Sequence, residues 1–265
     1  MTAYSCCPKC GHSPLPVVQA LPAACPACGV ILAKYAAAQT GAGMQVVRPL
    51  GKSATQDELA DKGRLTQILA LLVHVPPQVD TTGFWGRTVL LVFFTIWGLR
   101  LIVMDFRDGE MFTSFLHGPL LVFHEAGHVI FRLLGEFMMF LGGTLGQLLM
   151  PAILGGALLF KNRDPFGASI GLWLLGVSFL DVAPYVYDAL DPQLMLLSGT
   201  TGEEGGHDWI YLLKATGLLR QAHGIGWFVH KLGMGLVLLS MAWGGFILWQ
   251  QHKRLAGDVL DELGR

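Results

Sequence analysis

Long apolar runs occupy the second part of the chain, whereas the first 83 residues hold only short ones. A helix needs about 20 mostly apolar residues to cross the hydrocarbon layer of a membrane. Four runs approach that length, and we expect them to be membrane spans. They cover residues 87–104, 115–134, 166–190 and 224–250.

A further apolar run, residues 137–160, is interrupted by Gly142, Gly143, Gly146 and Pro151. We expect its first part to be re-entrant or strand-like and its second part to be helical. Irregular backbone survives at membrane depth only where protein or a watery cavity covers it. The predicted fold class is therefore mostly α, a polytopic helical membrane bundle of about four to six spans with a re-entrant Gly-rich segment.

The same pattern divides the chain into four parts. A short apolar stretch at residues 65–75 is too short to span and predicts an interfacial amphipathic helix. It belongs to a segment rich in Ala, Gly, Gln and Lys, which is typical of a linker. The parts are a cysteine-rich module at 1–35, the linker at 36–83, a transmembrane core at 84–250 and a C-terminal tail at 251–265.

Composition supports a lipid environment. Only 14% of the residues are charged and 52% are apolar, whereas soluble domains carry roughly 25% charged residues. The net charge of -1 gives no reason to expect a nucleic-acid partner. Lys and Arg residues before the first span favour a cytoplasmic N-terminus. We expect an integral protein of a bacterial inner (plasma) membrane, with the lipid bilayer as a partner.

The cysteine-rich module contains two Cys-x-x-Cys pairs separated by fourteen residues, Cys7 with Cys10 and Cys25 with Cys28. Four thiolates at this spacing match a tetrahedral structural zinc site. Cys6 is left over and is expected to be a bystander. The module resembles the zinc-ribbon family, which implies a structural or docking role and a possible protein partner for the ribbon.

The predicted span at 115–134 carries the sequence His124-Glu125-Ala126-Gly127-His128. Residues four apart lie on one face of a helix, so both imidazoles can bind one Zn²⁺. The glutamate between them is rotated by about 100° and can act as general base toward a zinc-activated water. Ionisable side chains inside a membrane span are costly unless they serve a site. The pattern predicts a catalytic zinc centre.

In this motif, and in the Gly-rich stretch from Phe140 to Gly146 that follows it, the chain resembles the site-2 protease family of intramembrane zinc metalloproteases. The resemblance implies a zinc endopeptidase that cleaves transmembrane segments of other membrane proteins. It also implies that an Asp from a later Asn-x-x-Pro…Asp-Gly motif supplies the third zinc ligand. Here that motif is altered, since Asp181-Val-Ala-Pro184 has Asp in place of Asn.

Three residues are candidates for the third ligand: Asp208, His207 and Asp188. We favour Asp208, which follows a Gly-rich loop and precedes an apolar helix as the family's Asp does. Its ordinary alternative role is to cap that helix. Asp181 is expected either to orient the histidines or the substrate, or to be an interfacial acid. Gln147 is expected to bond either substrate backbone or another helix.

Two other functions remain open at this point. A membrane metal-binding scaffold or metal transporter would use the same histidines without needing Glu125. An inactive relative with an incomplete ligand set would bind zinc in the ribbon alone. The predicted endopeptidase binds one catalytic and one structural Zn²⁺.

Overall fold

The computed structural model describes most of the chain and divides it into two compact units, residues 1–61 and 62–265. The predicted linker lies largely outside the described residues. The described residues are 4–7, 9–15, 23–32, 63, 66–75 and 79–263.

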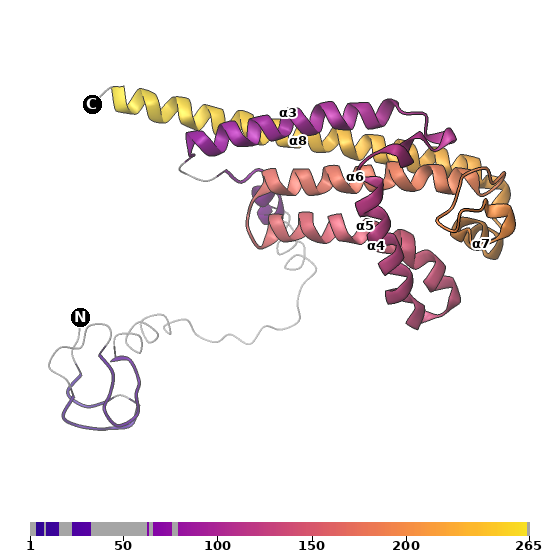
Figure 1. The fold of residues 1–265 in the computed structure, drawn as a ribbon. Coiled ribbons are helices and arrows are strands. Elements are labelled where there is room, and N and C mark those ends of the chain that lie inside the picture. The colour runs from indigo at the N-terminus through magenta and orange to yellow at the C-terminus, as the bar shows by residue number, and fades with distance from the viewer. Residues whose placement is uncertain are drawn as a thin grey trace. The chain divides into compact units, whose positions relative to one another are not determined.

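Helices make up most of the second unit (Figure 1). From Thr81 onward they are α3 (Thr81–Val103), α4 (His117–Phe131), α5 (Glu136–Phe160), α6 (Pro165–Asp188), α7 (Asp208–Ala215) and α8 (Ala222–Leu263), with short 3-10 turns between several of them. The described residues contain no strand, only two isolated β-bridges. The prediction of a mostly helical protein is confirmed.

Helix α6 forms the centre of this unit. In the most apolar stretch of α6, 67% of the residues are buried, whereas in that of α3 only 11% are buried. It runs beside α8 (Figure 1), and glycines on both helices allow the close approach. A Cβ on Gly176 would lie 3.0 Å from the carbonyl oxygen of Gly233. Trp173, Val177 and Leu180 of α6 belong to one buried apolar cluster with residues of the neighbouring helices.

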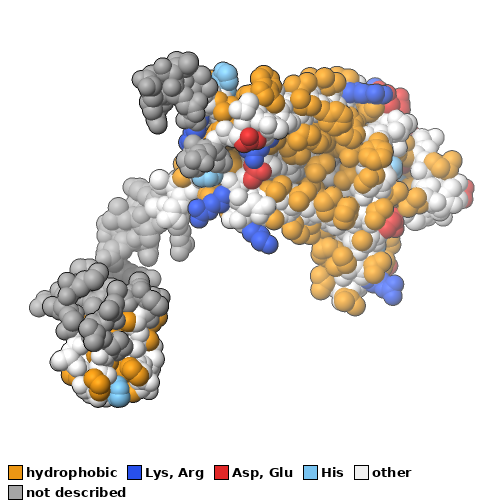
Figure 2. All heavy atoms as spheres, turned by 60° about the vertical axis from the view of Figure 1, so that its left-hand side comes forward, with side chains coloured by type: hydrophobic (Ala, Val, Ile, Leu, Met, Phe, Trp, Pro, Cys, Tyr) orange, Lys and Arg blue, Asp and Glu red, His pale blue; other side chains and the backbone are white. Residues whose placement is uncertain are grey.

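Among the described residues, four helical segments are long and apolar enough to cross a membrane. They are α3, α5, α6 and the segment Leu219–Gly257, which includes most of α8. Many of their large apolar side chains are exposed, such as Val89, Ile96 and Ile153. Figure 2 shows apolar side chains covering much of one face of the helical unit. A water-soluble protein rarely exposes an apolar patch of such extent, so these surfaces fit contact with lipid.

The predicted span at residues 115–134 is not among these four. Helix α4 has 15 residues, so it is only about 22 Å long, which is shorter than the hydrocarbon layer of about 30 Å. A 3-10 turn follows it, and Gly135 with φ of +101° ends that turn. Figure 1 shows α4 lying across the direction of α6 and α8 rather than along it.

The prediction of a strand-like backbone in the first part of residues 137–160 is wrong, because α5 is helical from end to end. The glycines serve helix packing instead. A Cβ on Gly142 would lie 2.7 Å from the carbonyl oxygen of Gly127 in α4, and one on Gly146 would also clash with α4 backbone. Small residues therefore let the two backbones approach each other closely.

Two predicted boundaries also shift. Helix α3 begins at Thr81, where the side chain of Asp80 caps it by accepting a hydrogen bond from the Gly83 backbone N–H at 2.6 Å. The predicted tail at 251–265 is largely a continuation of α8, which ends at Leu263. Residues 66–72 are helical, as expected for the short interfacial helix.

Candidate metal centres

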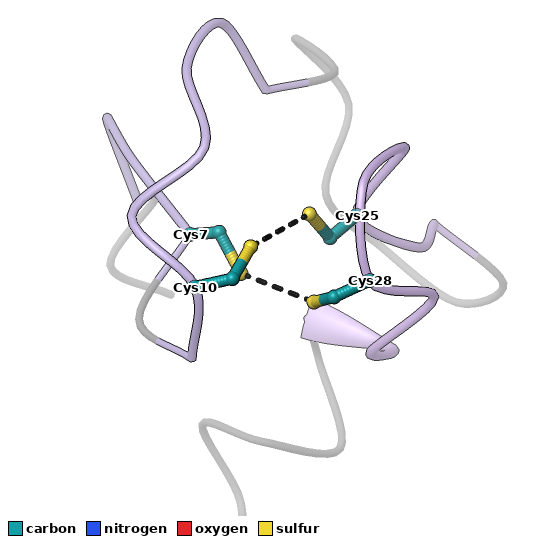
Figure 3. A group of neighbouring side chains, drawn as sticks. All are labelled: Cys7, Cys10, Cys25 and Cys28. Atoms are coloured by element: carbon teal, nitrogen blue, oxygen red, sulfur yellow. Dashed lines mark hydrogen bonds between the residues drawn. The ribbon is translucent and has the colours of Figure 1, made fainter.

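The four paired cysteines of the N-terminal module come together, as Figure 3 shows. Cys7 Sγ lies 3.7 Å from Cys28 Sγ, and Cys10 Sγ lies 3.8 Å from Cys25 Sγ. All four sulfur atoms lie within 4.8 Å of one another. Zinc–sulfur bonds of about 2.3 Å in a tetrahedron place the sulfurs about 3.8 Å apart, so the spacing fits this ion.

The same turn builds both halves of this cysteine group. Gly11 donates its backbone N–H to the Cys7 carbonyl at 2.8 Å, and Gly29 donates to the Cys25 carbonyl at 2.9 Å. Both glycines have positive φ, +75° and +69°, which residues with a Cβ rarely adopt. All five cysteines are free thiols rather than disulfides, and Cys6 lies outside the group.

A second group joins two helices far apart in sequence. Nε2 of His124 lies 3.0 Å from Oδ2 of Asp208, and Nε2 of His128 lies 3.2 Å from the same oxygen. The histidines project from α4, and the aspartate is the first residue of α7. Zinc bonds of about 2.0 Å to nitrogen and oxygen imply ligand separations of roughly 3.3 Å, so these three side chains fit one ion.

Hydrogen bonds on the other ring nitrogens orient both imidazoles. Nδ1 of His128 lies 2.8 Å from the backbone carbonyl oxygen of Met139, which accepts a hydrogen bond. Nδ1 of His124 lies 3.3 Å from Oε1 of Gln147. With their protons on Nδ1, both histidines turn the Nε2 lone pair toward Asp208, as metal ligands require.

Helix α6 holds the start of α7, and with it Asp208. The backbone N–H of Asp208 donates to the hydroxyl of Tyr185 at 3.1 Å. The ring of Tyr185 also stacks on His207, with centroids 4.2 Å apart. Sequence reasoning missed this role of Tyr185, for which the only available signal is an aromatic residue near the end of an apolar run.

The two other candidates for the third ligand pair with each other. His207 caps α7 by accepting a hydrogen bond from the Ile210 backbone N–H at 3.3 Å. Its Nε2 lies 3.3 Å from Oδ2 of Asp188, and the His207 side chain is fully buried. Of the three candidates, Asp208 is the one that meets His124 and His128.

Glu125 faces the same cavity as these ligands. The cavity has a volume of about 380 Å³. Glu125 is exposed, whereas His124 is buried, as expected for neighbours on a helix that point in different directions. The lining residues are Phe112, His117, Leu121, His124, Glu125, His128, Gln147, Asp181, Val182, Tyr185, Leu194, Met195, Leu196, Leu197, Ser198, Gly206 and Asp208.

Gly143 has a role that sequence reasoning missed. A Cβ at this position would lie 2.5 Å from Nε2 of His124 and 2.6 Å from Nε2 of His128. The absence of a side chain therefore leaves space on the metal-facing side of both rings. In the sequence, the signal for this role is the position of Gly143 in a Gly-rich stretch after the histidine motif. The same stretch is equally compatible with an irregular segment, so the signal does not identify the role.

Comparisons of the chain with protein-family models, with characterised proteins and with solved structures found no match. The resemblance to site-2 proteases therefore rests on the histidine motif and the Gly-rich stretch that follows it. The geometry does not depend on this resemblance: the part of the chain that the structure describes contains two groups of side chains that can hold a metal ion.

Proposed function

We propose that this chain is an intramembrane zinc endopeptidase similar to the site-2 proteases, which hydrolyses peptide bonds in transmembrane segments of other proteins. The observation that carries the proposal is the convergence of His124, His128 and Asp208 beside a cavity that Glu125 also lines. Two imidazoles and one carboxylate form a typical catalytic zinc set, which leaves a coordination position open.

Each of these residues has a separate chemical task. When bound, zinc supplies Lewis acidity at the point where the three ligands meet. Glu125 accepts a proton from the attacking water and delivers it to the leaving amine nitrogen. Gly143 keeps that point free of side-chain atoms, so that a peptide backbone can approach it.

The surroundings of the cavity favour an apolar peptide as substrate. The cavity is lined by the polar groups of the site and by the apolar sequence Leu194 to Leu197. The outer face of α4 exposes Val129 and Ile130, each more than 60% accessible. These features fit a membrane-embedded substrate segment that reaches the site from the lipid. In this proposal the cysteine group is a structural zinc ribbon that recruits a substrate or a partner protein.

The decisive experiment uses the full chain reconstituted in liposomes with a panel of tagged single-span reporter proteins. We expect wild type to cleave at least one reporter within its span, and Glu125→Gln to cleave none while keeping its zinc. Ile96→Val, a change at an exposed apolar residue of α3 that does not line the cavity, is the control and should cleave as wild type does. Equal cleavage by Glu125→Gln would overturn the proposal.

The same preparations separate the competing functions. A metal transporter would carry zinc into liposomes at the same rate with Glu125→Gln, but not with His124→Ala. An inactive relative would contain one zinc per chain, in the ribbon, and would cleave no reporter. We further propose that the protein lies in a bacterial plasma membrane with its N-terminus in the cytoplasm. The Lys and Arg residues that precede the first apolar run favour this orientation.

A further inference from the structure

A chain of polar side chains extends from the metal centre through three helices. It begins at Nδ1 of His124, which faces Oε1 of Gln147 at 3.3 Å. Nε2 of Gln147 then donates to Oδ2 of Asp181 at 2.8 Å. The other carboxylate oxygen, Oδ1, lies 2.9 Å from Nδ1 of His117. The four residues come from α4, α5 and α6.

The two middle residues are deeply buried. Gln147 is 3% exposed and Asp181 is 4% exposed, in helices whose residues are mostly apolar. A buried carboxylate and a buried amide are costly unless their hydrogen bonds are satisfied, and in a membrane such groups usually serve a function. Gln147 does not take the place of a metal ligand, because its contact is with the far nitrogen of His124.

The direction of each hydrogen bond follows from chemistry. An ionised carboxylate only accepts, so Asp181 requires Gln147 to turn its NH₂ group toward α6. The amide oxygen of Gln147 must then face His124, where it accepts a hydrogen bond from Nδ1–H. A neutral imidazole with its proton on Nδ1 has its lone pair on Nε2. The hydrogen bonds from Asp181 through Gln147 are therefore compatible with the tautomer of His124 whose Nε2 is free to bind metal.

We propose that Gln147 and Asp181 are positioning residues that fix the tautomer and ring orientation of His124 for metal binding. The inference rests on the metal centre of the proposed function, but not on peptidase activity. Outer partners of this kind commonly change metal affinity by about 10- to 100-fold when removed. His117 contacts the remaining oxygen of Asp181 at the far end of the chain.

The first test measures metal affinity of the purified full chain by zinc competition with a chelator. The cysteine group serves as an internal reference, because it should keep its zinc in every variant. We expect Gln147→Met, which keeps similar bulk without hydrogen bonds, to weaken binding at the second site about 10- to 100-fold. The matched control is Gln251→Met, because Gln251 is also buried, at 1% exposure, but lies in α8 outside the site.

The second test exchanges the two groups. Gln147→Glu alone sets one carboxylate against another and should lower both zinc affinity and folded yield. Gln147→Glu combined with Asp181→Asn moves the negative charge from α6 to α5. The new Asn amide on α6 then donates a hydrogen bond to the new carboxylate on α5, and this carboxylate still accepts a hydrogen bond from Nδ1–H of His124. We expect the double variant to recover wild-type affinity, and its Co²⁺-substituted form to recover the visible absorption of the second site.

Every outcome of these tests bears on the positioning role. Wild-type affinity in Gln147→Met, or no recovery in the double variant relative to Gln147→Glu, would overturn it. If Gln147→Met does not fold, the comparison between the single and the double exchange decides alone. A wild-type chain that binds zinc only at the cysteine group would overturn the metal centre itself, which is a different failure from loss of positioning.

Discussion

Gly143 on α5 lies directly against Nε2 of His124 on α4, so closely that a Cβ at position 143 would come within 2.5 Å of this nitrogen. The contact joins the Gly-rich helix to the metal ligands. A glycine at this point keeps clear the space that a bound ion and an approaching substrate would both need.

Gly143→Ala should therefore lose metal at the second centre. The added methyl group occupies the metal-facing side of both imidazoles, and neither ring can move without breaking its Nδ1 hydrogen bond. We expect zinc content to fall from two ions to one, measured by elemental analysis of the purified protein. A Cβ on Gly156 in the same helix would meet nothing within 4 Å, so the control variant Gly156→Ala should keep both ions.

Substitution of the ligands should distinguish Asp208 from its neighbour. Asp208→Ala is expected to abolish zinc binding at the second centre, because this residue contacts both histidines. His207→Ala should retain two zinc ions but unfold more readily, since loss of a helix cap costs about 1 kcal/mol. The reverse result, with zinc lost in His207→Ala and kept in Asp208→Ala, would contradict the ligand assignment.

The cysteine group should lose its ion independently of the membrane unit. Cys10→Ser combined with Cys28→Ser removes one thiolate from each pair and should reduce zinc content by one ion. Reporter cleavage in liposomes would then report on the ribbon's role, because the second centre keeps its ligands. Cys6→Ser, which changes a thiol outside the group, should leave zinc content unchanged.

The packing of α4 against α5 should be sensitive to any side chain added at Gly127. A Cβ there would clash with the carbonyl oxygen of Gly142, and overpacking of this kind typically costs about 1–3 kcal/mol. We expect Gly127→Ala to lower the midpoint of thermal unfolding in detergent. Gly118 lies in the same helix, and a Cβ there would meet nothing within 4 Å. The Gly118→Ala variant should therefore have an unfolding midpoint at least as high as that of wild type.

The local part of the metal centre follows from the sequence pattern alone, whereas the distant ligand, Asp208, is favoured only through the resemblance to site-2 proteases. His124 and His128 are four residues apart, so helix geometry alone places them on one face. Asp208 is 84 residues from His124, and its approach depends on how α6 holds the start of α7. Local pattern does not separate it sharply from His207 and Asp188, because any of the three can bind zinc.

The Gly-rich segment is hard to interpret from sequence because glycine has two opposite uses. It permits irregular backbone, and it also permits close packing of regular helices. Choosing between them requires knowledge of the neighbouring helix, which the local pattern does not contain. Here Gly127 on α4 faces Gly142 and Gly146 on α5, and the backbone stays helical throughout.

The shortness of α4 has a consequence for the lipid. A 15-residue helix falls about 8 Å short of a hydrocarbon layer of roughly 30 Å, and α4 also lies across the direction of α6 and α8 (Figure 1). In a chain embedded as we propose, α4 therefore does not cross the layer by itself, and its ends need protein or water around them. Water admitted at such an end would reach the cavity beside Glu125 by a short path. A substrate helix that meets this water would lose the lipid support that keeps it wound.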